Sequence, residues 1–494
     1  MTDTTDPAPQ GLFCAIPSRL AVGERFALKV KVLGPVRELA PRAQFHTTKP
    51  ALHGPFNRNV ERAIRYVDDV LPRYEGRLRV SADSGLDGPA EIVFDGVHQG
   101  AFPGDTRPIR VLDGYAWREP GLHFLRLEDP ATGLVAWSNP VRVTEAPPAH
   151  RIAWGDPHWQ TFFSDGIRCP EELHAFARDE AFLDFGAVSD HMEAVTDRQW
   201  DYFQAVTNDY NDPGRFVTLV GQEWTNHELS VGAPGHRNIY YRGSGGPALR
   251  SDDPQCNTLD KLWARLDEMN DVEAIAIPHH TANARMGVDW SKGWNPRYEK
   301  AVEIYSVWGC SERPAEAGNP RPIAAENLGG EKAGQHVIDA LERGYRFGFV
   351  AGGDIHDGRP GDAKHADSYP PRGYRPHDQG FTAVMVPELT REAVFDAIAN
   401  RQTYATTMSR IYLDVHPEPS DESMQLRLRT AAPDGIAEAT VVVNGKDSRR
   451  IVPDRDDRVI DTLIDLAPLG SDEFAYIRIT TRGGDMAWST PVWG

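Results

Sequence analysis

The most constraining feature of this 494-residue chain is a series of short apolar runs that alternate with helical patterns. Between about Arg151 and Met408 we interpret seven such runs as strands: residues 152–154, 183–188, 216–220, 274–277, 302–304, 347–351 and 382–386. Apolar residues at helical spacing predict helices over residues 170–182, 258–269, 335–343 and 391–400. Buried strands that alternate with helices are typical of a parallel sheet, and seven units favour a (β/α)7 barrel over an open sheet.

The segments on both sides of this region have a different pattern. Short alternating stretches separated by Gly, Pro and Asp turns run from Leu20 to about Val143 and again after about Ile411, which is typical of antiparallel β-sandwiches. We therefore predict an α/β protein in which a distorted (β/α)7 barrel at residues 149–410 is flanked by a β-sandwich-like domain at 1–148 and a small β domain at 411–494.

Side chains that bind metals follow five of the seven predicted strands. They are His158 after the first strand, Asp190 and His191 after the second, Glu223 after the third, His279 and His280 after the fourth, and Asp354 and His356 after the sixth. A barrel brings the carboxyl ends of its strands to one face, so we expect one metal centre there. Mixed imidazole and carboxylate ligands favour zinc, manganese or iron over calcium, and hydrolysis by a metal-bound hydroxide is the natural chemistry of such a centre.

The motifs around these residues resemble the PHP (polymerase and histidinol phosphatase) metallohydrolases, and more closely a PHP-like branch catalogued as a domain of unknown function. The motifs lie between about Trp154 and Met408 and read GDPHWQT (155–161), SDG (164–166), LDFGAVSDH (183–191), GQEW (221–224), GHRN (235–238), IPHH (277–280) and GDIHDG (353–358). Together they are specific, whereas any one of them alone is a weak signal.

The resemblance implies a ligand set and two or three divalent ions (Zn, Mn or Fe) in a distorted seven-stranded barrel. The implied ligands are His158, Asp165, His191, Glu223, His236, one of His279 and His280, Asp354 and His356, with Glu223 as the bridge. The chain departs from the PHP pattern at Gln160, where the family has the second His of a His-x-His pair. An amide oxygen is a poorer ligand than imidazole. Either one metal position is weakened or empty, or Gln160 hydrogen-bonds the substrate or a metal-bound water.

We expect further roles for residues next to these ligands. Asp190 would orient a ligand from behind or bind metal directly, and a nearby His or Asp would protonate the leaving group. The predicted catalytic residues are Asp190, His191, Glu223, His356 and Gln160, and the predicted substrate contacts are Gln160, Trp159, Trp224, Arg237 and Trp308. The alternatives are that the tryptophans lie in the core and that the arginine pairs with a carboxylate. Side chains alternate along a strand, so His279 and His280 should point in opposite directions.

The substrate class follows less directly from the sequence. Aromatic residues and few clustered Lys or Arg favour an ester, amide or carbamate over a phosphoester, so we predict a metal-dependent hydrolase of a small molecule. One alternative is a phosphoesterase proper, and another is a catalytically degenerate PHP-like binding module, in keeping with Gln160. The loop-like segment 358–380 either covers the site or is a surface insertion.

The composition of the chain limits the classes of binding partner that we expect. A formal net charge of -19 argues against a nucleic-acid or anionic-membrane surface, and no run of apolar residues is long enough for a membrane span. The first ten residues lack the basic start and apolar core of a signal peptide, which predicts a cytoplasmic protein acting on a small molecule. The sequence leaves the oligomeric state open.

Overall fold

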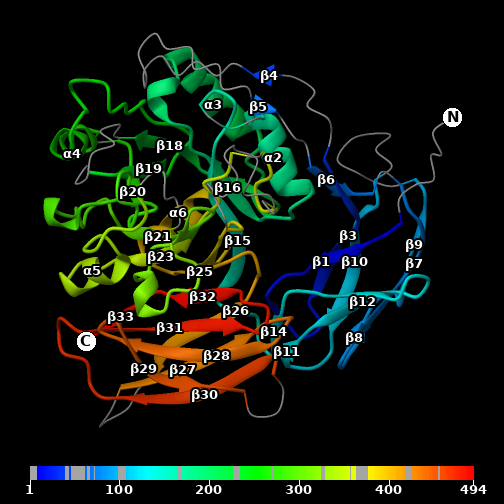
Figure 1. The fold of residues 1–494 in the computed structure, drawn as a ribbon. Helices are drawn as coiled ribbons and strands as arrows, with labels where there is room; N and C mark the ends of the chain where they lie inside the picture. Colours follow the sequence, from blue (N-terminus) through cyan, green and yellow to red (C-terminus); the bar gives the residue numbers. More distant parts are fainter. Residues whose placement is uncertain are drawn as a thin grey trace.

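The computed structural model describes residues 8–38, 44–45, 62–63, 67–71, 73–97, 107–164, 166, 168–225, 234–269, 271–323, 329–356, 358–362, 377–418, 424–453 and 457–494. Figure 1 shows N-terminal strands on one side, C-terminal strands along the base, and a region of strands and helices above them. The protein is therefore a mixed α/β chain with several sheets, as the sequence predicts.

The N-terminal region consists of β-strands in small sheets. One sheet contains β1 (Gly11–Ala15), β3 (Arg25–Glu38), β10 (Ile109–Trp117), β8 (Leu86–Asp87) and β6 (Val67–Val70). A second contains β13 (Leu134–Trp137), β12 (Leu125–Asp129), β7 (Glu75–Ala82) and β9 (Glu91–Asp95). The others contain β11 (Gly121–His123), β14 (Val141–Thr144) and β2 (Arg19–Ala21), and the pair β4 (Gln44–Phe45) and β5 (Arg62–Ala63). Alternating apolar side chains such as Leu28, Leu78 and Leu127 meet in one buried core.

The C-terminal region is also made of strands. One sheet contains β26 (Tyr412–Glu418), β27 (Met424–Ala431) and β30 (Val459–Leu466). The other strands are β28 (Ile436–Val443), β29 (Lys446–Ile451), β31 (Phe474–Thr481), β32 (Met486–Ser489) and β33 (Val492–Trp493). Both flanking regions therefore have the strand content that their alternating sequences predict.

All seven predicted runs of the middle region contain strands. The strands are β15 (Arg151–Trp159), β16 (Phe185–Val188), β17 (Val217–Thr218), β18 (Val220–Thr225), β19 (His236–Tyr241), β20 (Ala274–Pro278), β21 (Ala301–Ser306), β22 (Gly309–Cys310), β23 (Gly348–Ala351), β24 (Phe381–Val386) and β25 (Thr403–Thr406). The helices are α2 (Pro170–Asp179), α3 (Asp197–Asp209), α4 (Leu259–Asp267), α5 (Val337–Glu342) and α6 (Arg391–Ala399), with short 3₁₀ turns η1 (Met192–Ala194), η2 (Trp290–Lys292) and η3 (Ala315–Ala317). The sequence prediction omitted β19, β25 and α3, although Thr196 and Gln199 form a capping box at the start of α3.

The strand pairing corrects the prediction of one parallel sheet. Strands β15, β16 and β17 pair in parallel, as do β21 and β23, but β24 is antiparallel to β15. Strands β18, β19 and β20 form an antiparallel meander. The described strands therefore form separate hydrogen-bonded sheets, with side-by-side contacts where β16 meets β18, β20 meets β21, and β23 meets β24. The reason is β19, a polar insertion that reverses the chain between two apolar strands.

One sheet continues from the middle region into the C-terminal region. Strand β25 pairs with β24 on one side and with β32 on the other, and the sheet then runs on through β31, β28 and β29. Hydrogen bonds therefore cross the boundary predicted at residues 410–411, and the three-domain division stays a prediction.

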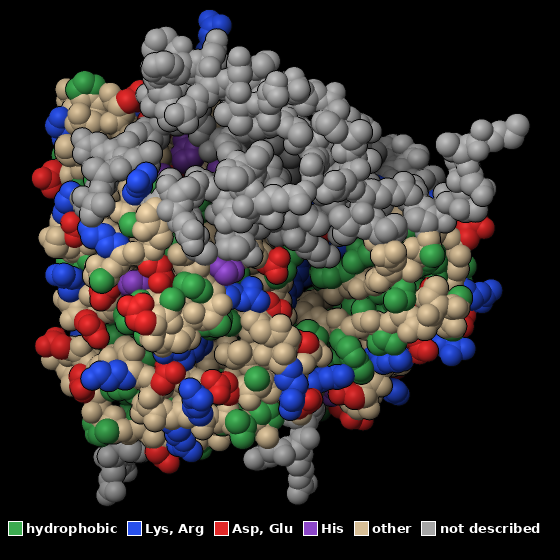
Figure 2. All heavy atoms as spheres, in the orientation of Figure 1, with side chains coloured by type: hydrophobic (Ala, Val, Ile, Leu, Met, Phe, Trp, Pro, Cys, Tyr) green, Lys and Arg blue, Asp and Glu red, His purple; other side chains and the backbone are tan. Residues whose placement is uncertain are grey.

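The outer surface and the helix lengths bear on possible partners. Acidic and basic side chains are interspersed over the face drawn in Figure 2. Within the described part of the chain, no helix has the length and apolar content needed to cross a membrane.

Candidate metal centre

Eight predicted ligands from different strands form one buried group, which we call the strand-end cluster. It consists of His158, His191, Glu223, His236, His279, His280, Asp354 and His356. His158 lies near the end of β15, Glu223 within β18 and His236 at the start of β19. The two histidines at 279 and 280 follow β20, and Asp354 and His356 follow β23. None of the eight residues is more than 9% exposed, so their charges are held away from water.

Glu223 lies at the middle of the strand-end cluster. Its Oε1 lies 2.8 Å from His236 Nδ1, 3.2 Å from His191 Nδ1 and 3.4 Å from His279 Nε2. Its Oε2 lies 3.6 Å from His158 Nε2. Burial alone would raise the pKa of Glu223, but the surrounding imidazoles, His191 and His279 foremost, hold that pKa well below its usual range. Glu223 is therefore a carboxylate with both oxygens directed at imidazoles.

Asp354 is the second carboxylate of the cluster. Its Oδ1 lies 3.4 Å from His158 Nε2 and 3.5 Å from His356 Nε2, and its Oδ2 lies 3.9 Å from His280 Nε2. The backbone is left-handed at Asp354, with φ of 47°, and at His280, with φ of 34°. Such conformations are unfavourable for residues other than glycine and are found where the surrounding structure requires a particular side-chain direction. Here they turn both side chains into the cluster.

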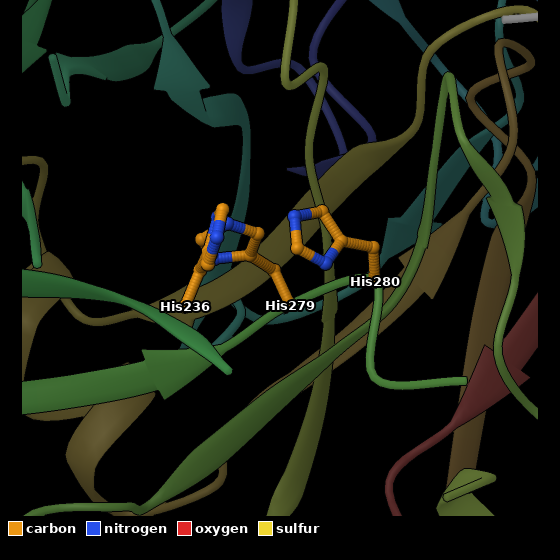
Figure 3. A group of neighbouring side chains, drawn as sticks. All are labelled: His236, His279 and His280. Carbon is orange, nitrogen blue, oxygen red and sulfur yellow. The ribbon is translucent and has the colours of Figure 1, made fainter. Parts of the chain in front are cut away.

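Three overlapping groups in this cluster have the spacing of metal ligands. They are His236 with His279 and His280, His158 with Glu223 and His279, and His191 with Glu223 and His236, and within each group the ligand atoms lie within 4.8 Å of one another. Figure 3 shows the rings of the first group gathered from β19 and from the segment after β20. Glu223 belongs to two groups and His279 to two, so the groups share ligands.

Six buried nitrogens of these rings lack hydrogen-bond partners among the described residues. They are Nε2 of His158, both ring nitrogens of His236 and His279, and Nδ1 of His280. His236 Nδ1 is near Glu223, but the contact does not have hydrogen-bond geometry. Buried polar atoms without partners are rare and costly in folded proteins, and a divalent cation would satisfy several of these at once. The donor set therefore fits zinc, manganese or iron.

The pKa values of these histidines are shifted in different directions. Burial lowers the pKa of His236 to about 4 and holds the pKa of His280 well below its usual range, with neighbouring imidazoles adding to the shift at His280. Burial would also lower the pKa of His158, but the charges of Asp354 and Glu303 outweigh it and raise that pKa well above its usual range. At neutral pH His236 and His280 are therefore neutral, which is the form that binds metal.

The expectation that His279 and His280 point in opposite directions is wrong. Their ring centroids lie 4.3 Å apart, and both rings lie in the same group of possible ligands (Figure 3). Strand β20 ends at Pro278, so the alternation of a strand does not extend to these residues. The left-handed backbone at His280 brings the second ring to the same side as the first.

Two acidic residues that the sequence prediction did not include form hydrogen bonds that hold residues of the strand-end cluster in place. Glu303 on β21 places Oε2 3.0 Å from His158 Nδ1 and is 2% exposed. Asp156 accepts hydrogen bonds from the backbone of His158 at 3.0 Å and of Gly353 at 2.8 Å, which ties β15 to the chain before Asp354. A glutamate in the middle of the buried run Ala301–Ser306 was the available signal for Glu303. A carboxylate behind a metal-binding histidine fixes its ring and tautomer.

Gln160 and Asp190 are connected to Glu223 by hydrogen bonds. Gln160 Nε2 donates to Glu223 Oε2 at 2.7 Å, and Ser164 Oγ donates to Gln160 Oε1 at 2.7 Å. Asp190 Oδ1 in turn accepts from Ser164 and from the backbone and side chain of Thr161. Burial raises the pKa of Asp190 to about 6. Gln160 therefore contacts the central carboxylate, and Asp190 holds the turn that carries Ser164.

The predicted substrate residues have different surroundings. Trp224 is fully buried and its Nε1 donates to the backbone of Cys256 at 2.9 Å. Arg237 is fully buried and its Nε donates to Glu299 Oε1 at 2.9 Å. Trp159 is fully buried with its ring centroid 5.4 Å from that of His174, whereas the Trp308 ring lies 5.7 Å from His280. Of these four described side chains, Trp308 is the one whose ring contacts the strand-end cluster.

Two predictions concern residues outside the described ranges. Asp165, one of the implied ligands, lies outside them, as does most of the segment 358–380. Residues 358–362 are described, and there Asp362 accepts from Arg359 at 2.8 Å and pairs with Lys31 of β3 at 3.1 Å. The covering role of the segment stays a prediction.

Comparison with protein families gives one match. The family model described as "Protein of unknown function (DUF3604)" matches residues 167–301 and 340–442. These residues include seven of the eight members of the strand-end cluster, all except His158.

Similar curated proteins come from chlamydiae. Uncharacterized proteins of Chlamydia muridarum, Chlamydia trachomatis serovar D and Chlamydia pneumoniae are 29%, 27% and 28% identical to this chain. Each match covers 78% of this chain and 63% of the relative, so the chain spans less than two thirds of these relatives.

The chain is also similar to a solved structure. It is the crystal structure of a two-domain protein containing a predicted PHP-like metal-dependent phosphoesterase from Bacteroides vulgatus, with 13% sequence identity and a TM-score of 0.36. The match covers 67% of this chain and 91% of that chain.

Proposed function

We propose that this chain, a member of the DUF3604 family, is a metal-dependent hydrolase that acts on a small molecule. The observation that carries the proposal is the convergence of buried imidazole nitrogens without hydrogen-bond partners on Glu223, among the described residues. A cluster built only for stability would pair these atoms with one another or with backbone groups.

The proposed metal ligands are the residues of the three overlapping groups. Glu223 and His279 each belong to two groups, which supports Glu223 as a bridge between neighbouring ions. Asp354 and His356 would complete the coordination from the opposite side, since Asp354 lies within 4 Å of three of the histidines. A bound zinc, manganese or iron ion would lower the pKa of water and polarise the bond under attack.

The chain's own residues would fix the geometry of the reaction. Glu303 holds His158 through Nδ1 and thereby directs its Nε2 toward Glu223 and Asp354. Gln160 donates to Glu223 Oε2, so in this role it orients the central carboxylate instead of replacing an imidazole ligand. We therefore assign Glu303 and Gln160 as positioning residues.

The substrate would approach from the side of His280 and Trp308. The indole ring of Trp308 lies 5.7 Å from His280 and offers an apolar surface next to the cluster. Arg237, the predicted anion-binding residue, is instead paired with Glu299. These two observations favour an ester, amide or carbamate over a phosphoester as the bond that is cleaved.

We also propose that the middle region is a distorted form of the predicted barrel. The contacts of β16 with β18, β20 with β21 and β23 with β24 connect its sheets in a ring, and β15 pairs with both β16 and β24. In such a ring the cluster would lie where the strands end, as active sites do in barrel enzymes.

A hydrolysis assay tests the function. The full chain is freed of metal with a chelator, reloaded with zinc, manganese or iron, and assayed with nitrophenyl acetate, a nitrophenyl carbamate and nitrophenyl phosphate. We expect metal-dependent turnover of at least one substrate and its loss in Glu223→Ala. Glu273→Ala, which changes an exposed glutamate, is the matched control and should keep full activity.

The assay also separates the enzyme from a degenerate binding module. Metal binding without turnover of any substrate would favour the module, for which Gln160 in place of an imidazole is the supporting observation. A folded chain that binds no metal would exclude the metal-dependent hydrolase and leave the binding module.

A further inference from the structure

A second cavity lies between the N-terminal region and the middle region. Its volume is about 490 Å³, which is within the range of small-molecule sites. It is lined by residues 15–19 next to β2, by residues 151–154 at the start of β15, and by residues 386–389 after β24. His158 lies near the other end of β15, so this cavity is separate from the strand-end cluster.

Two cations face this cavity without a carboxylate partner. Lys29 on β3 and Arg410 after β25 both line it, and Arg410 is only 9% exposed. The Arg410 Nη2 donates to the carbonyls of Ala181 at 2.9 Å and Phe182 at 2.8 Å. In the part of the chain that is described, no carboxylate oxygen lies within 4.0 Å of either cation, and the contact recorded for Lys29 Nζ is with the Phe182 ring at 5.8 Å.

The acidic residues that line the cavity are engaged or exposed. Asp184 Oδ2 accepts from the backbone of Trp154 at 2.9 Å, and Glu24 pairs with Arg151 and accepts from the backbone of Ala21 at 2.9 Å. Glu388 is exposed. The remaining cation, Arg19, pairs with Asp414 at 3.3 Å. Among the described residues, Lys29 and Arg410 therefore form no ion pair with a carboxylate, and the charge of Asp184 acts on both cations without a direct contact.

Such an arrangement is unfavourable unless something else balances it. Burial lowers the pKa of Lys29, and the Arg410 charge lowers it further. Burial also lowers the pKa of Arg410 to about 10. The charge of Asp184 opposes both pKa shifts but does not cancel them. Buried charges in proteins are normally paired. The rest of the lining is mostly apolar and includes Ile16, Phe182 and Leu389.

We propose that this cavity binds a small organic anion, with its anionic group between Lys29 and Arg410 and its apolar body against Ile16, Phe182 and Leu389. The anionic group is a carboxylate or a phosphate, because both accept charge-assisted hydrogen bonds from Lys and Arg. This site does not depend on the metal centre or on the proposed hydrolase activity.

Calorimetric titration of the full chain tests the proposal. Benzoate and phenyl phosphate are the probes, because they carry the same ring and differ in the anionic group. The titrations are carried out on the wild type and on Glu223→Ala, in which hydrolysis of phenyl phosphate is not expected. We expect saturable binding of one probe in both proteins, and the preferred probe identifies the anionic group.

Variants connect binding to the two cations. Lys29→Gln should weaken the binding of the preferred probe by at least about tenfold, because a charge-assisted hydrogen bond is lost. Lys29→Arg should keep the affinity within about threefold, since the charge remains. Lys261→Gln, a change of an exposed lysine in α4, is the matched control and should bind like the wild type.

The melting temperature of each variant shows whether a loss of binding is caused by a failure to fold. Removing a cation that burial disfavours and that has no ion-pair partner among the described residues should leave the melting temperature of ligand-free Lys29→Gln equal to or above that of the wild type. The proposal is overturned if neither probe binds the wild type at millimolar concentration. It is also overturned if Lys29→Gln and Arg410→Gln bind as the wild type does, or if ligand-free Lys29→Gln is less stable.

Discussion

Two buried charged clusters in this molecule differ in how their polar atoms are satisfied. Around Glu312, Oε1 accepts from Tyr476 at 2.6 Å and Arg478 at 2.8 Å, and Oε2 accepts from Trp488 at 2.9 Å. Asp447 takes the remaining Nη2 donor of Arg478 at 2.8 Å. We call these five residues the Glu312 cluster. In the strand-end cluster, by contrast, six ring nitrogens of four histidines have no hydrogen-bond partner among the described residues.

The contrast distinguishes structural charge from a binding site. The Glu312 cluster lies between the middle and C-terminal regions, and its charges are compensated by the chain itself. The strand-end cluster gathers donors that face one another around two carboxylates, which is favourable only when a cation is shared among them. The Glu312 cluster therefore stabilises the contact of two regions, and the strand-end cluster is consistent with metal binding.

We expect the largest changes, in melting temperature and in metal affinity, when the metal or the Glu223 side chain is removed. A metal present at 1,000 times its Kd stabilises the folded state by about 4 kcal/mol, so chelation should lower the melting temperature and zinc, manganese or iron should restore it. Loss of residues behind a ligand weakens metal binding by about 10 to 100-fold, so Glu223→Ala should weaken it by more than about 100-fold. Calorimetric metal titration measures this, and an unchanged affinity would contradict the assignment.

The next effect concerns the Glu312 cluster. Glu312→Gln leaves Arg478 buried with one carboxylate partner and should lower the free energy of unfolding by roughly 3–5 kcal/mol. Metal content per folded chain should not change. Urea unfolding measures the first quantity. The control Glu438→Gln, which removes a partly exposed pair with Arg450, should cost less than about 1 kcal/mol. Loss of metal in Glu312→Gln would contradict the distinction between the two clusters, because it would show that the Glu312 cluster also affects metal binding.

A third prediction compares two buried histidines. His336 contacts Asp339 and Glu331, which outweigh its burial and raise its pKa to about 9, whereas the pKa of His236 is lowered to about 4. A raised pKa stabilises the folded state below the ordinary value of 6.5, and this stabilisation of roughly 3 kcal/mol is lost as pH rises from 6.5 through 9.

The measurement is urea unfolding of the wild type and His336→Gln across that range. The difference in the free energy of unfolding between the two proteins should be large below pH 6.5 and small above pH 9. A constant difference would show that the His336 charge does not contribute.

The smallest predicted effect concerns the hydrogen bond between Glu303 and His158. Glu303→Gln removes the carboxylate behind Nδ1 of His158 and should weaken metal binding by about 10 to 100-fold without unfolding the chain. Glu273→Gln is the exposed control and should have no effect. Equal affinities in the two variants would show that Glu303 has no part in the metal centre.

Much of the candidate site was predictable because metal ligands are chemically distinctive residues at strand ends. His158, Glu223 and His279 follow or end apolar runs, and the seven runs all contain strands. Glu303 was harder to find, because a single Glu in a buried strand carries no signal of its partner, His158, at a distance of 145 residues in sequence.

The details of the sheets were not predictable from apolar runs. Strand β19 has the sequence HRNIYY, and its polar residues are buried because they bind partners such as Glu299, which the sequence does not reveal. The continuation of one sheet from β25 into β32 depends on pairing between residues such as Tyr404 and Ser489, far apart in the chain. Trp224 and Arg237 were predicted substrate contacts, and in the structure they donate hydrogen bonds to Cys256 and Glu299.

The most direct test of the account is the metal content per chain, measured by inductively coupled plasma mass spectrometry on full-length protein purified without chelator. We predict two or three equivalents of zinc, manganese or iron in the wild type, in keeping with the three overlapping ligand groups. We also predict loss of this metal in Glu223→Ala and its retention in Glu312→Gln. A folded wild-type chain without metal, or equal metal content in wild type and Glu223→Ala, would contradict these predictions.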